Sequence, residues 1–538
     1  MNSTVAESGV APSEVRRAIG EGTQQGVSAV LSRAPLGLSA PLVRAEVHLG
    51  TGIPAFYLVG LPEAVVRESK ERVRAALQTS GFGFPEGRIT VNLSPADLPK
   101  EGGRFDLPIA VGILAANGQL PAHVLKGREF YGELSLGGEL RDTPKLLPAL
   151  IAGSESGREL ILPFANSLEA ALVGHANLKL AKDLAQVCAA LAGRAVWSRA
   201  EGSADLKAHI TGENTADPQF HARRAAPDLA EVRGQFAGKR ALEIAAAGQH
   251  GLLMIGPPGA GKTLLAQRLP GLLPPLSKSE ALEVASVESA AGRKPQNGGR
   301  RPFRSPQHTA SVASLIGGGA LRPGELSLAH LGVLFLDELP EFARNALEAL
   351  REPLESGVVN VTRMKRTCEF PARFQLIAAM NPCPCGYAGD PSGRCHCTGE
   401  QAARYRARIS GPLVDRIDIH IELGALPVEH LIDQAPGESE TSAAVALRVA
   451  AARQLQMERQ GKLNARLSPP ETERFCALGR DSKILISTAI ARLGLSARAY
   501  HRVLKVARTC ADLAGSPNIR RIDVAEAVQL RALDKPIC

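Results

Sequence analysis

The chain has 538 residues, of which 44% are hydrophobic and 22% charged. It is therefore too long for a single core and can bury several, so about three domains are expected. A formal net charge of +9 permits a polyanionic partner but also fits an ordinary basic enzyme. A single Trp and five Tyr argue against a base-stacking platform for single strands, so any nucleic acid would be held mainly through its phosphates.

The N-terminus lacks the basic, apolar and small-residue order of a signal peptide, and no apolar run approaches the length of a membrane span. We therefore expect a cytoplasmic protein without a membrane partner. Nine cysteines are too few for a disulfide scaffold in a chain of this length, which favours reduced thiols.

The N-terminal part of the sequence predicts an α+β domain over residues 31–200. Residues 1–30 are polar and have no clear period, so we expect a disordered tail. Apolar residues alternate from Val43 to Leu49, and a turn leads into Ala55 to Val59, which predicts a hairpin. Further predicted elements are a helix over Val65 to Leu77, strands at Ile89 to Leu93 and near Phe130 to Leu134, and a helix at Leu107 to Ala116.

The next segment, residues 201–226, loses periodicity and gains turn residues, which predicts a linker. A P-loop ATPase core is expected from residue 227 to residue 427. It is centred on Gly256-Pro257-Pro258-Gly259-Ala260-Gly261-Lys262-Thr263, which follows the apolar run Leu252 to Ile255 and precedes a helix-like segment. Backbone N–H groups of such a loop cradle a triphosphate, the lysine neutralises the β- and γ-phosphates, and the threonine hydroxyl binds Mg²⁺. The loop therefore predicts ATP and Mg²⁺ as cofactors.

Two later apolar strands end in polar residues that suit ATP hydrolysis. Gly332 to Leu336 precedes Asp337 and Glu338, which predicts a Walker B strand with Asp337 at the Mg²⁺ shell and Glu338 as general base. Phe374 to Met380 ends in Asn381, whose amide can bond the attacking water or the γ-phosphate.

Two arginines farther along the chain are candidates for stabilising the charge that develops on the γ-phosphate in the transition state. Arg416 lies just past the core, where it could reach a neighbouring subunit's nucleotide, and Arg498 opens a predicted helix. From residue 428 to residue 538 strand signals vanish, and a small α-helical lid domain is expected. Its predicted helices are Leu485 to Leu493, Tyr500 to Ala514 and Asp523 to Leu533.

Four cysteines form two close pairs on a Gly-rich loop: Cys383, Cys385, Cys395 and Cys397. Four thiolates make a closed tetrahedral shell for a structural Zn²⁺, whereas free reduced thiols are the alternative. We interpret His308, His330 and His396 as loop histidines with ordinary hydrogen-bond partners.

Residues 358–370 alternate like a hairpin and place Arg363, Lys365 and Arg366 at or near its tip. In a ring pore, these cations would meet a phosphate backbone. A solvated turn is the alternative. A pore loop that threads protein would present an aromatic residue, and this tip has none.

The sequence resembles the magnesium-chelatase-like AAA+ ATPases of the ComM/YifB group over about Leu31 to Lys535, nearly the whole chain. The motifs that carry the resemblance are Arg301-Pro302-Phe303-Arg304-Ser305-Pro306, Gly317-Gly318-Gly319, Pro323-Gly324-Glu325-Leu326-Ser327-Leu328-Ala329-His330, Pro371-Ala372-Arg373-Phe374, Val91-Asn92-Leu93-Ser94-Pro95-Ala96-Asp97-Leu98, Phe105-Asp106-Leu107-Pro108-Ile109-Ala110 and Leu504-Lys505-Val506-Ala507-Arg508-Thr509. One departure is Gln307, where the group more often has a second histidine beside His308.

The resemblance implies a multidomain α/β protein with an AAA+ P-loop core, a helix-2 insert and a helical lid. It also implies a homo-hexamer in the presence of ATP and DNA, with Asn381 as sensor 1, Arg416 as the trans arginine finger and Arg498 as sensor 2. ComM members are DNA branch-migration helicases of natural transformation, so single-stranded and branched DNA are the implied partners, with recombination proteins as further candidates.

The N-terminal domain is similar to the Lon-protease (ribosomal S5 domain 2-like) fold, as seen in Gly132 to Glu139. The positions of the Lon Ser/Lys dyad fall on Arg104 and near Pro148, neither of which supports nucleophilic catalysis. We therefore expect a binding or assembly module without peptidase activity. The competing functions are a magnesium-chelatase-type motor subunit, which lacks this N-terminal domain, and an AAA+ protein remodeller.

Overall fold

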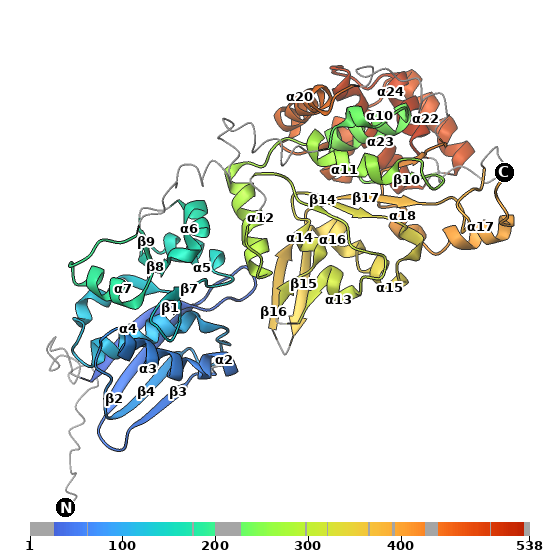
Figure 1. Ribbon diagram of the computed structural model, residues 1–538. Coiled ribbons are helices and arrows are strands. Elements are labelled where there is room, and N and C mark those ends of the chain that lie inside the picture. The colour runs from blue at the N-terminus through green and yellow to red at the C-terminus, as the bar shows by residue number, and fades with distance from the viewer. Residues whose placement is uncertain are drawn as a thin grey trace, which may run out of the picture. The chain divides into compact units, whose positions relative to one another are not determined.

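The structure is a computed structural model that describes residues 26–61, 63–174, 177–198, 227–295, 299–319, 321–363, 366–389, 393–425, 440–494 and 496–531. The chain divides into two compact units, Met1–Ser203 and Ala204–Cys538 (Figure 1). Each unit is mixed α/β and has its own buried apolar core. None of the helices in the described ranges combines the length and the apolar composition of a membrane span. The predicted linker, residues 201–226, lies outside the described residues.

The first unit is built on a seven-stranded mixed sheet in the order β3-β4-β2-β1-β5-β8-β9. β2 pairs antiparallel with β1 and β4, whereas the remaining neighbours are parallel. Helix α4 (Asp106–Ala116) packs on β1 and β2. The strands are β1 (Val27–Arg33), β2 (Leu42–Gly50), β3 (Ala55–Val59), β4 (Arg88–Ser94), β5 (Arg128–Phe130), β8 (Glu159–Pro163) and β9 (Leu178–Ala181).

Two predictions for this unit are wrong. β2 and β3 do not form a hairpin, because β4 lies between them and pairs with both. The predicted tail extends too far, because β1 begins at Val27 and its buried side chains alternate against β2. The predicted helix over Val65 to Leu77 is observed as α2 (Ala64–Arg67) and α3 (Ser69–Thr79).

The remaining helices of the first unit are α5 (Leu147–Glu155), α6 (Ser167–Val173) and α7 (Leu184–Leu191), and the strand pair β6 (Glu133–Leu134) and β7 (Leu140–Arg141) completes it. Arg104 is buried and donates to the carbonyl of Pro144 at 2.6 Å, and its burial lowers the pKa of its guanidinium to about 10. Pro148 lies in the first turn of α5.

The second unit contains a five-stranded, wholly parallel sheet in the order β11-β14-β17-β10-β18. Every residue of β10, β14 and β17 is buried, which explains why these strands read as uninterrupted apolar runs in the sequence. The carboxyl ends of parallel strands share one edge of the sheet, where ligands bind in open α/β folds. The strands are β10 (Leu252–Ile255), β11 (Phe303–Arg304), β14 (Val333–Leu336), β17 (Gln375–Met380) and β18 (Ile419–Glu422).

Two small hairpins stand on the connections between these strands. The first, β12 (Gly317–Gly318) with β13 (Arg322–Pro323), lies between β11 and β14, and the second, β15 (Val358–Arg363) with β16 (Arg366–Pro371), lies between β14 and β17. The first hairpin packs on β15, and a Cβ on Gly317 would lie 3.2 Å from Val361. The second hairpin extends away from the sheet (Figure 1).

Helices complete the core of the second unit. The P-loop helix α11 packs against β14 and β17, and α10 packs against β10 and β18. The core helices are α10 (Phe236–Gly248), α11 (Lys262–Leu272), α12 (Lys278–Ala290), α13 (Val312–Ile316), α14 (Glu325–Leu328), α15 (Arg344–Glu348), α16 (Arg351–Ser356), α17 (Gly399–Arg406) and α18 (Gly411–Val414).

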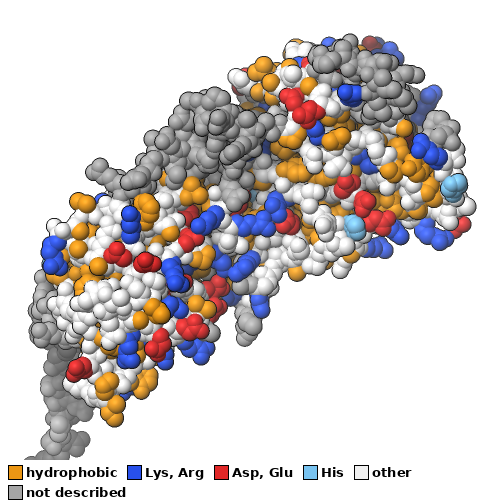
Figure 2. Space-filling model, in the orientation of Figure 1, with side chains coloured by type: hydrophobic (Ala, Val, Ile, Leu, Met, Phe, Trp, Pro, Cys, Tyr) orange, Lys and Arg blue, Asp and Glu red, His pale blue; other side chains and the backbone are white. Residues whose placement is uncertain are grey.

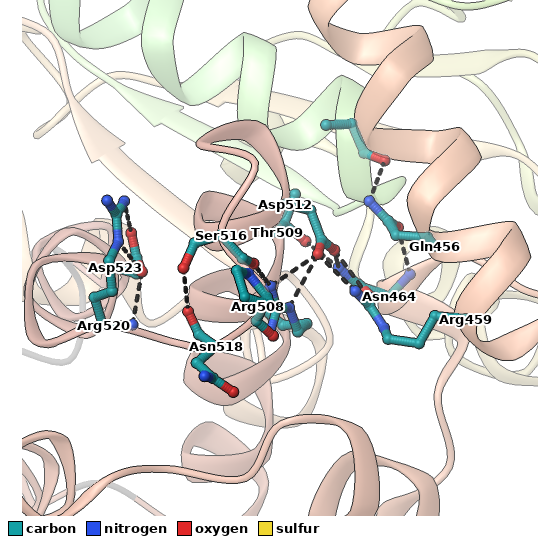
Figure 3. A network of polar contacts seen from close by, with 12 residues as sticks. Gln456, Arg459, Asn464, Arg508, Thr509, Asp512, Ser516, Asn518, Arg520 and Asp523 are labelled. Carbon is teal, nitrogen blue, oxygen red and sulfur yellow. Dashed lines mark hydrogen bonds and ion pairs between the residues drawn. The ribbon is translucent and has the colours of Figure 1, made fainter.

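The regular secondary structure described after residue 440 is helical, and it packs on α10 through α20 and α23. The helices are α20 (Ser442–Gln460), α21 (Pro469–Phe475), α22 (Arg480–Leu493), α23 (Ala497–Leu513) and α24 (Arg521–Gln529). A buried carboxylate, Asp512 of α23, accepts from Arg459, Asn464 and Arg508 (Figure 3). These charge-assisted bonds fix the connection after α20 on α23.

Candidate nucleotide site

The P-loop runs from the end of β10 into α11, as the sequence predicts. Gly259 and Gly261 adopt left-handed φ angles of +79° and +84°, a region that residues with a Cβ rarely occupy. With these turns the loop passes directly into the helix, and the N-terminal N–H groups of α11 face the loop.

The lysine of the loop is held beside the sensor candidate. Lys262 Nζ donates to the carbonyl oxygens of Gly256 at 2.6 Å and Pro257 at 3.0 Å, and to Asn381 Oδ1 at 3.1 Å. Burial lowers the pKa of Lys262, while the charges of Asp337 and Glu338 oppose that shift. The Asn381 amide at the end of β17 and the Lys262 ammonium group of the P-loop are therefore in contact.

The hydroxyl of Thr263 donates to Asp337 Oδ2 at 2.8 Å. Asp337 follows β14 and also accepts from the backbone N–H of Glu338 through Oδ1 at 2.9 Å. A hydroxyl and a carboxylate oxygen in contact at the edge of a parallel sheet are suitable ligands for Mg²⁺. These two side chains are therefore the ones that could hold the metal ion.

Glu338 has an unusual backbone, with a φ of +52°. A residue with a Cβ in this region is uncommon and costs of order 1 to 3 kcal/mol, and such residues cluster at functional sites. Its side chain is half-exposed, and its Oε2 lies 3.2 Å from His308 Nδ1. His308 is therefore more than the loop histidine expected from the sequence, because it contacts the candidate general base.

A second histidine, His330, lies among internal hydrogen-bond partners. His330 is buried, lies 3.0 Å from Glu283, and accepts from the backbone N–H of Arg373 at 3.0 Å. Burial lowers the pKa of His330 to about 4. It is therefore neutral at neutral pH, and its interpretation as an internally bonded histidine fits these contacts.

The two candidate arginines occupy different environments. Arg416, just after α18, is mostly buried, and its Nη2 lies 2.6 Å from Glu355 Oε1. Arg498 is exposed in the first turn of α23. Neither arginine forms a described contact with the Lys262, Asp337 and Glu338 group.

The four cysteines come together. Their sulfur atoms lie within 4.8 Å of one another, and Cys383 is 3.3 Å from Cys385 and 3.8 Å from Cys395. A tetrahedron with Zn–S bonds of about 2.3 Å has S–S edges of about 3.8 Å, so the cluster has the size of a zinc shell. Backbone N–H groups of Tyr387 and His396 lower the pKa of Cys385 to about 6. The donor set therefore fits Zn²⁺.

The cysteine loop lies against the nucleotide site. Cys383 is two residues after Asn381, and a Cβ on Gly386 would lie 2.7 Å from Cδ of Pro258 in the P-loop. Nothing in the sequence pattern indicates this contact, because the two glycine-containing loops are more than a hundred residues apart.

The hairpin predicted over residues 358–370 is confirmed. Arg363 pairs with Arg366 at the last register position, and Arg363 is exposed. Lys365 lies outside the described residues. Val359, Val361, Cys368 and Phe370 are buried farther along the face that carries Arg363, because residues two apart in a strand share a face. Lys and Arg side chains gather at the free end of this hairpin on the face shown in Figure 2.

Known proteins are similar in sequence to this chain along almost its entire length. The family "Magnesium chelatase, subunit ChlI" matches residues 228–431, its C-terminal family matches residues 439–531, and the family "Subunit ChlI of Mg-chelatase" matches residues 45–166. Competence protein ComM of Haemophilus influenzae is 49% identical over 508 residues, covering 94% of this chain and 97% of that protein. The chain belongs to the ComM/YifB group of magnesium-chelatase-like proteins.

Other relatives agree with this assignment. Protein YifB of Escherichia coli is 46% identical over 512 residues, covering 95% of this chain and 98% of that protein. The magnesium-chelatase 67 kDa subunit of Heliobacterium mobile is 28% identical over 230 residues, only 37% of this chain and 31% of that subunit. Membership of the ComM/YifB group, a family of AAA+ proteins, implies ATP and Mg²⁺ as cofactors and ATPase activity.

Sequence reasoning missed three features of this site: the contact of His308 with Glu338, the ion pair of Arg416 with Glu355, and the contact of Gly386 with Pro258. The resemblance drew attention to His308 through the unusual Gln307 beside it, but gave no partner. Each contact joins separate segments of the chain, so no local pattern carries it.

Proposed function

We propose that the protein is an ATP-driven, hexameric DNA motor that moves strands or branches, as in the integration of incoming single-stranded DNA during transformation and recombination. The name of the Haemophilus relative, competence protein ComM, supports a role connected with DNA. In this proposal the backbone of Gly256 to Gly261 binds the phosphates, Lys262 neutralises them, and Thr263 and Asp337 hold Mg²⁺.

In the proposed reaction, Glu338 accepts the proton of the attacking water and Asn381 orients that water or the γ-phosphate. The 3.1 Å contact between Asn381 and Lys262 supports this placement of the amide. Arg416 would act on the nucleotide of a neighbouring subunit and Arg498 on that of its own, where a guanidinium stabilises charge spread over the γ-phosphate oxygens.

The observation that carries the DNA part of the proposal is the position of the basic hairpin. This hairpin, β15 with β16, is inserted between β14, which is followed by Asp337 and Glu338, and β17, which is followed by Asn381. Because both flanking strands end at the nucleotide site, a conformational change at that site would move the hairpin that carries Arg363 and Arg366. Cations at a hairpin tip, with no aromatic residue, suit a phosphate backbone rather than an unfolded peptide.

The cysteine cluster would hold one structural Zn²⁺, which would order the loop between Asn381 and α17. All four ligand positions are filled by protein, so the metal would not take part in the hydrolysis. The first unit, for which we propose a Lon-protease-like fold, would serve binding or assembly, since the dyad positions fall on Arg104 and near Pro148. Residues 428–538 would form the lid over the nucleotide.

A salt titration of DNA binding tests this proposal. Replacing Arg363, Lys365 and Arg366 with Ala should weaken binding about equally for all sequences, because phosphate contacts carry no base information. Each lost contact should flatten the plot of log affinity against log salt by about 0.7 for single strands. Basal ATPase should survive, whereas stimulation by DNA should be lost. An unchanged salt slope with intact stimulation would move the DNA path away from this hairpin.

A further inference from the structure

The side chain of Arg416 is held by its own subunit. Its Nη2 lies 2.6 Å from Glu355 Oε1, and its Nη1 donates to the carbonyl of Pro412 at 2.7 Å. Its Nε is buried and finds no acceptor among the described residues. The Arg416 side chain is 10% exposed, whereas that of Glu355 is 57% exposed. An arginine that must reach a neighbouring subunit's nucleotide would have to leave these contacts.

The backbone of Arg416 is anchored separately. Arg502 of α23 donates from Nη1 to the Arg416 carbonyl at 2.9 Å and pairs with Asp418. Asp418 is buried and lies 3.0 Å from Nδ1 of His250. The Nε2 atom of His250 lies 2.8 Å from the hydroxyl of Thr509, a residue labelled in Figure 3. Buried charge-assisted bonds of this kind are strong, so the side chain of Arg416 can change its direction while its backbone stays in place.

Glu355 is continuous with the basic hairpin. It belongs to the last turn of α16, and only Ser356 and Gly357 separate it from Val358, the first residue of β15. The Ser356 hydroxyl accepts from the Val358 N–H at 3.2 Å, and Ala372, just past β16, donates to the Gly357 carbonyl at 2.7 Å. A displacement of the hairpin by a bound strand would therefore be passed on to Glu355.

We propose that Glu355 is a positioning residue that restrains the Arg416 guanidinium on its own subunit, and that DNA bound to the basic hairpin releases this restraint. The inference rests on the proposed trans role of Arg416. It deepens that role by explaining how bound DNA would stimulate ATP hydrolysis. An ion pair with one largely exposed partner is weak, so a small movement of α16 is enough to break it.

The test is Glu355→Gln in the full-length protein, with Glu352→Gln as the matched control. Glu352 is exposed on the same helix, and no ion pair to it is described. Glu355→Gln should raise the basal kcat about twofold to fivefold, the range for loss of a weak ion pair, and leave the KM for ATP unchanged. The rate with DNA should stay at the wild-type value, so the stimulation factor should fall by the same amount. Glu352→Gln should behave as wild type.

The outcomes separate this inference from the function on which it rests. Arg416→Ala should lose turnover, and adding Glu355→Gln to it should restore nothing. Loss of turnover in Arg416→Ala together with a wild-type basal rate and stimulation factor in Glu355→Gln would overturn the restraint alone. Wild-type turnover in Arg416→Ala would overturn the finger role and the restraint with it. Equal melting temperatures of the two glutamine variants would exclude a fold defect as the cause of a changed rate.

Discussion

Gly386→Ala separates two physical effects at the contact between the cysteine loop and the P-loop. Gly386 has a φ of +88°, and an added Cβ would lie 2.7 Å from Cδ and 2.9 Å from Cγ of Pro258. Gly389, on the same loop, has a φ of +80° and no atom within 4 Å of the position of its Cβ. Gly389→Ala therefore introduces similar backbone strain without the clash.

The size of the expected effect follows from this difference. A left-handed conformation costs a residue with a Cβ about 1 to 2 kcal/mol, and both variants carry that cost. Only Gly386→Ala adds overpacking against a rigid proline ring, which costs typically about 1 to 3 kcal/mol. If the P-loop takes up the displacement, ATP affinity should fall about 5-fold to 150-fold, since about 1.4 kcal/mol is a factor of ten.

The assay is a titration with a fluorescent ATP analogue, together with the melting temperature of each variant. Gly386→Ala should bind the nucleotide much more weakly than Gly389→Ala, while both should lose some thermal stability. Equal nucleotide affinities in the two variants would refute the reasoning, because the contact with Pro258 would then have no influence on the phosphate loop.

Three further predictions concern the same unit. Lys262→Ala should lose nucleotide binding, whereas Glu338→Gln should bind ATP and stall, as seen by comparing nucleotide affinity with phosphate release; wild-type hydrolysis by Glu338→Gln would remove the general base. Reduced protein should carry about one zinc per chain by elemental analysis, and Cys385→Ser should release it; metal-free wild type would dispose of the site. Burial lowers the pKa of His420 to about 3, with a contribution from Arg531. The buried neutral imidazole therefore contributes fully to the free energy of unfolding above about pH 6.5. That contribution decreases by about 1.4 kcal/mol per pH unit as the pH falls toward 3. Urea unfolding at pH 7 and pH 5 should show a smaller loss of stability for His420→Gln than for the wild type, and equal losses would contradict the buried neutral form.

The sheet of the second unit could be predicted from the sequence because its central strands are buried on both faces. β10, β14 and β17 therefore appear as continuous apolar runs, and the polar residues that follow them mark the carboxyl edge. The basic hairpin was predictable for a different reason: its strands alternate between buried and exposed residues.

Strand partners could not be predicted in the same way. Alternation over β2 and β3 identifies two strands, but the intervening place of β4 depends on pairing between distant segments. β1 was missed because two side chains on its buried face, Ser28 and Ser32, are polar, so the sequence shows no apolar alternation there. The helix α20 was not predicted, although its buried residues recur at helical spacing. Its exposed face also carries the apolar residues Leu447, Leu455 and Met457, which obscure the pattern.

The residues of the candidate site also differ in whether a local sequence pattern identifies them. Residues at strand ends and in the P-loop were identifiable by their spacing, and the structure brings Lys262, Asp337 and Asn381 to one edge. His308 and Glu355 were not identifiable, because a half-exposed histidine or glutamate has no distinguishing local pattern. Their importance comes from the partners that the fold gives them.

The central claim is that ATP hydrolysis at this site drives movement on DNA. The most direct measurement is the steady-state ATPase rate of the full-length protein without DNA and with single-stranded, duplex and forked DNA, alongside Glu338→Gln as the inactive control. We expect Mg²⁺-dependent hydrolysis that rises with single-stranded or forked DNA and is absent in Glu338→Gln. Hydrolysis that is the same with and without every DNA would contradict it.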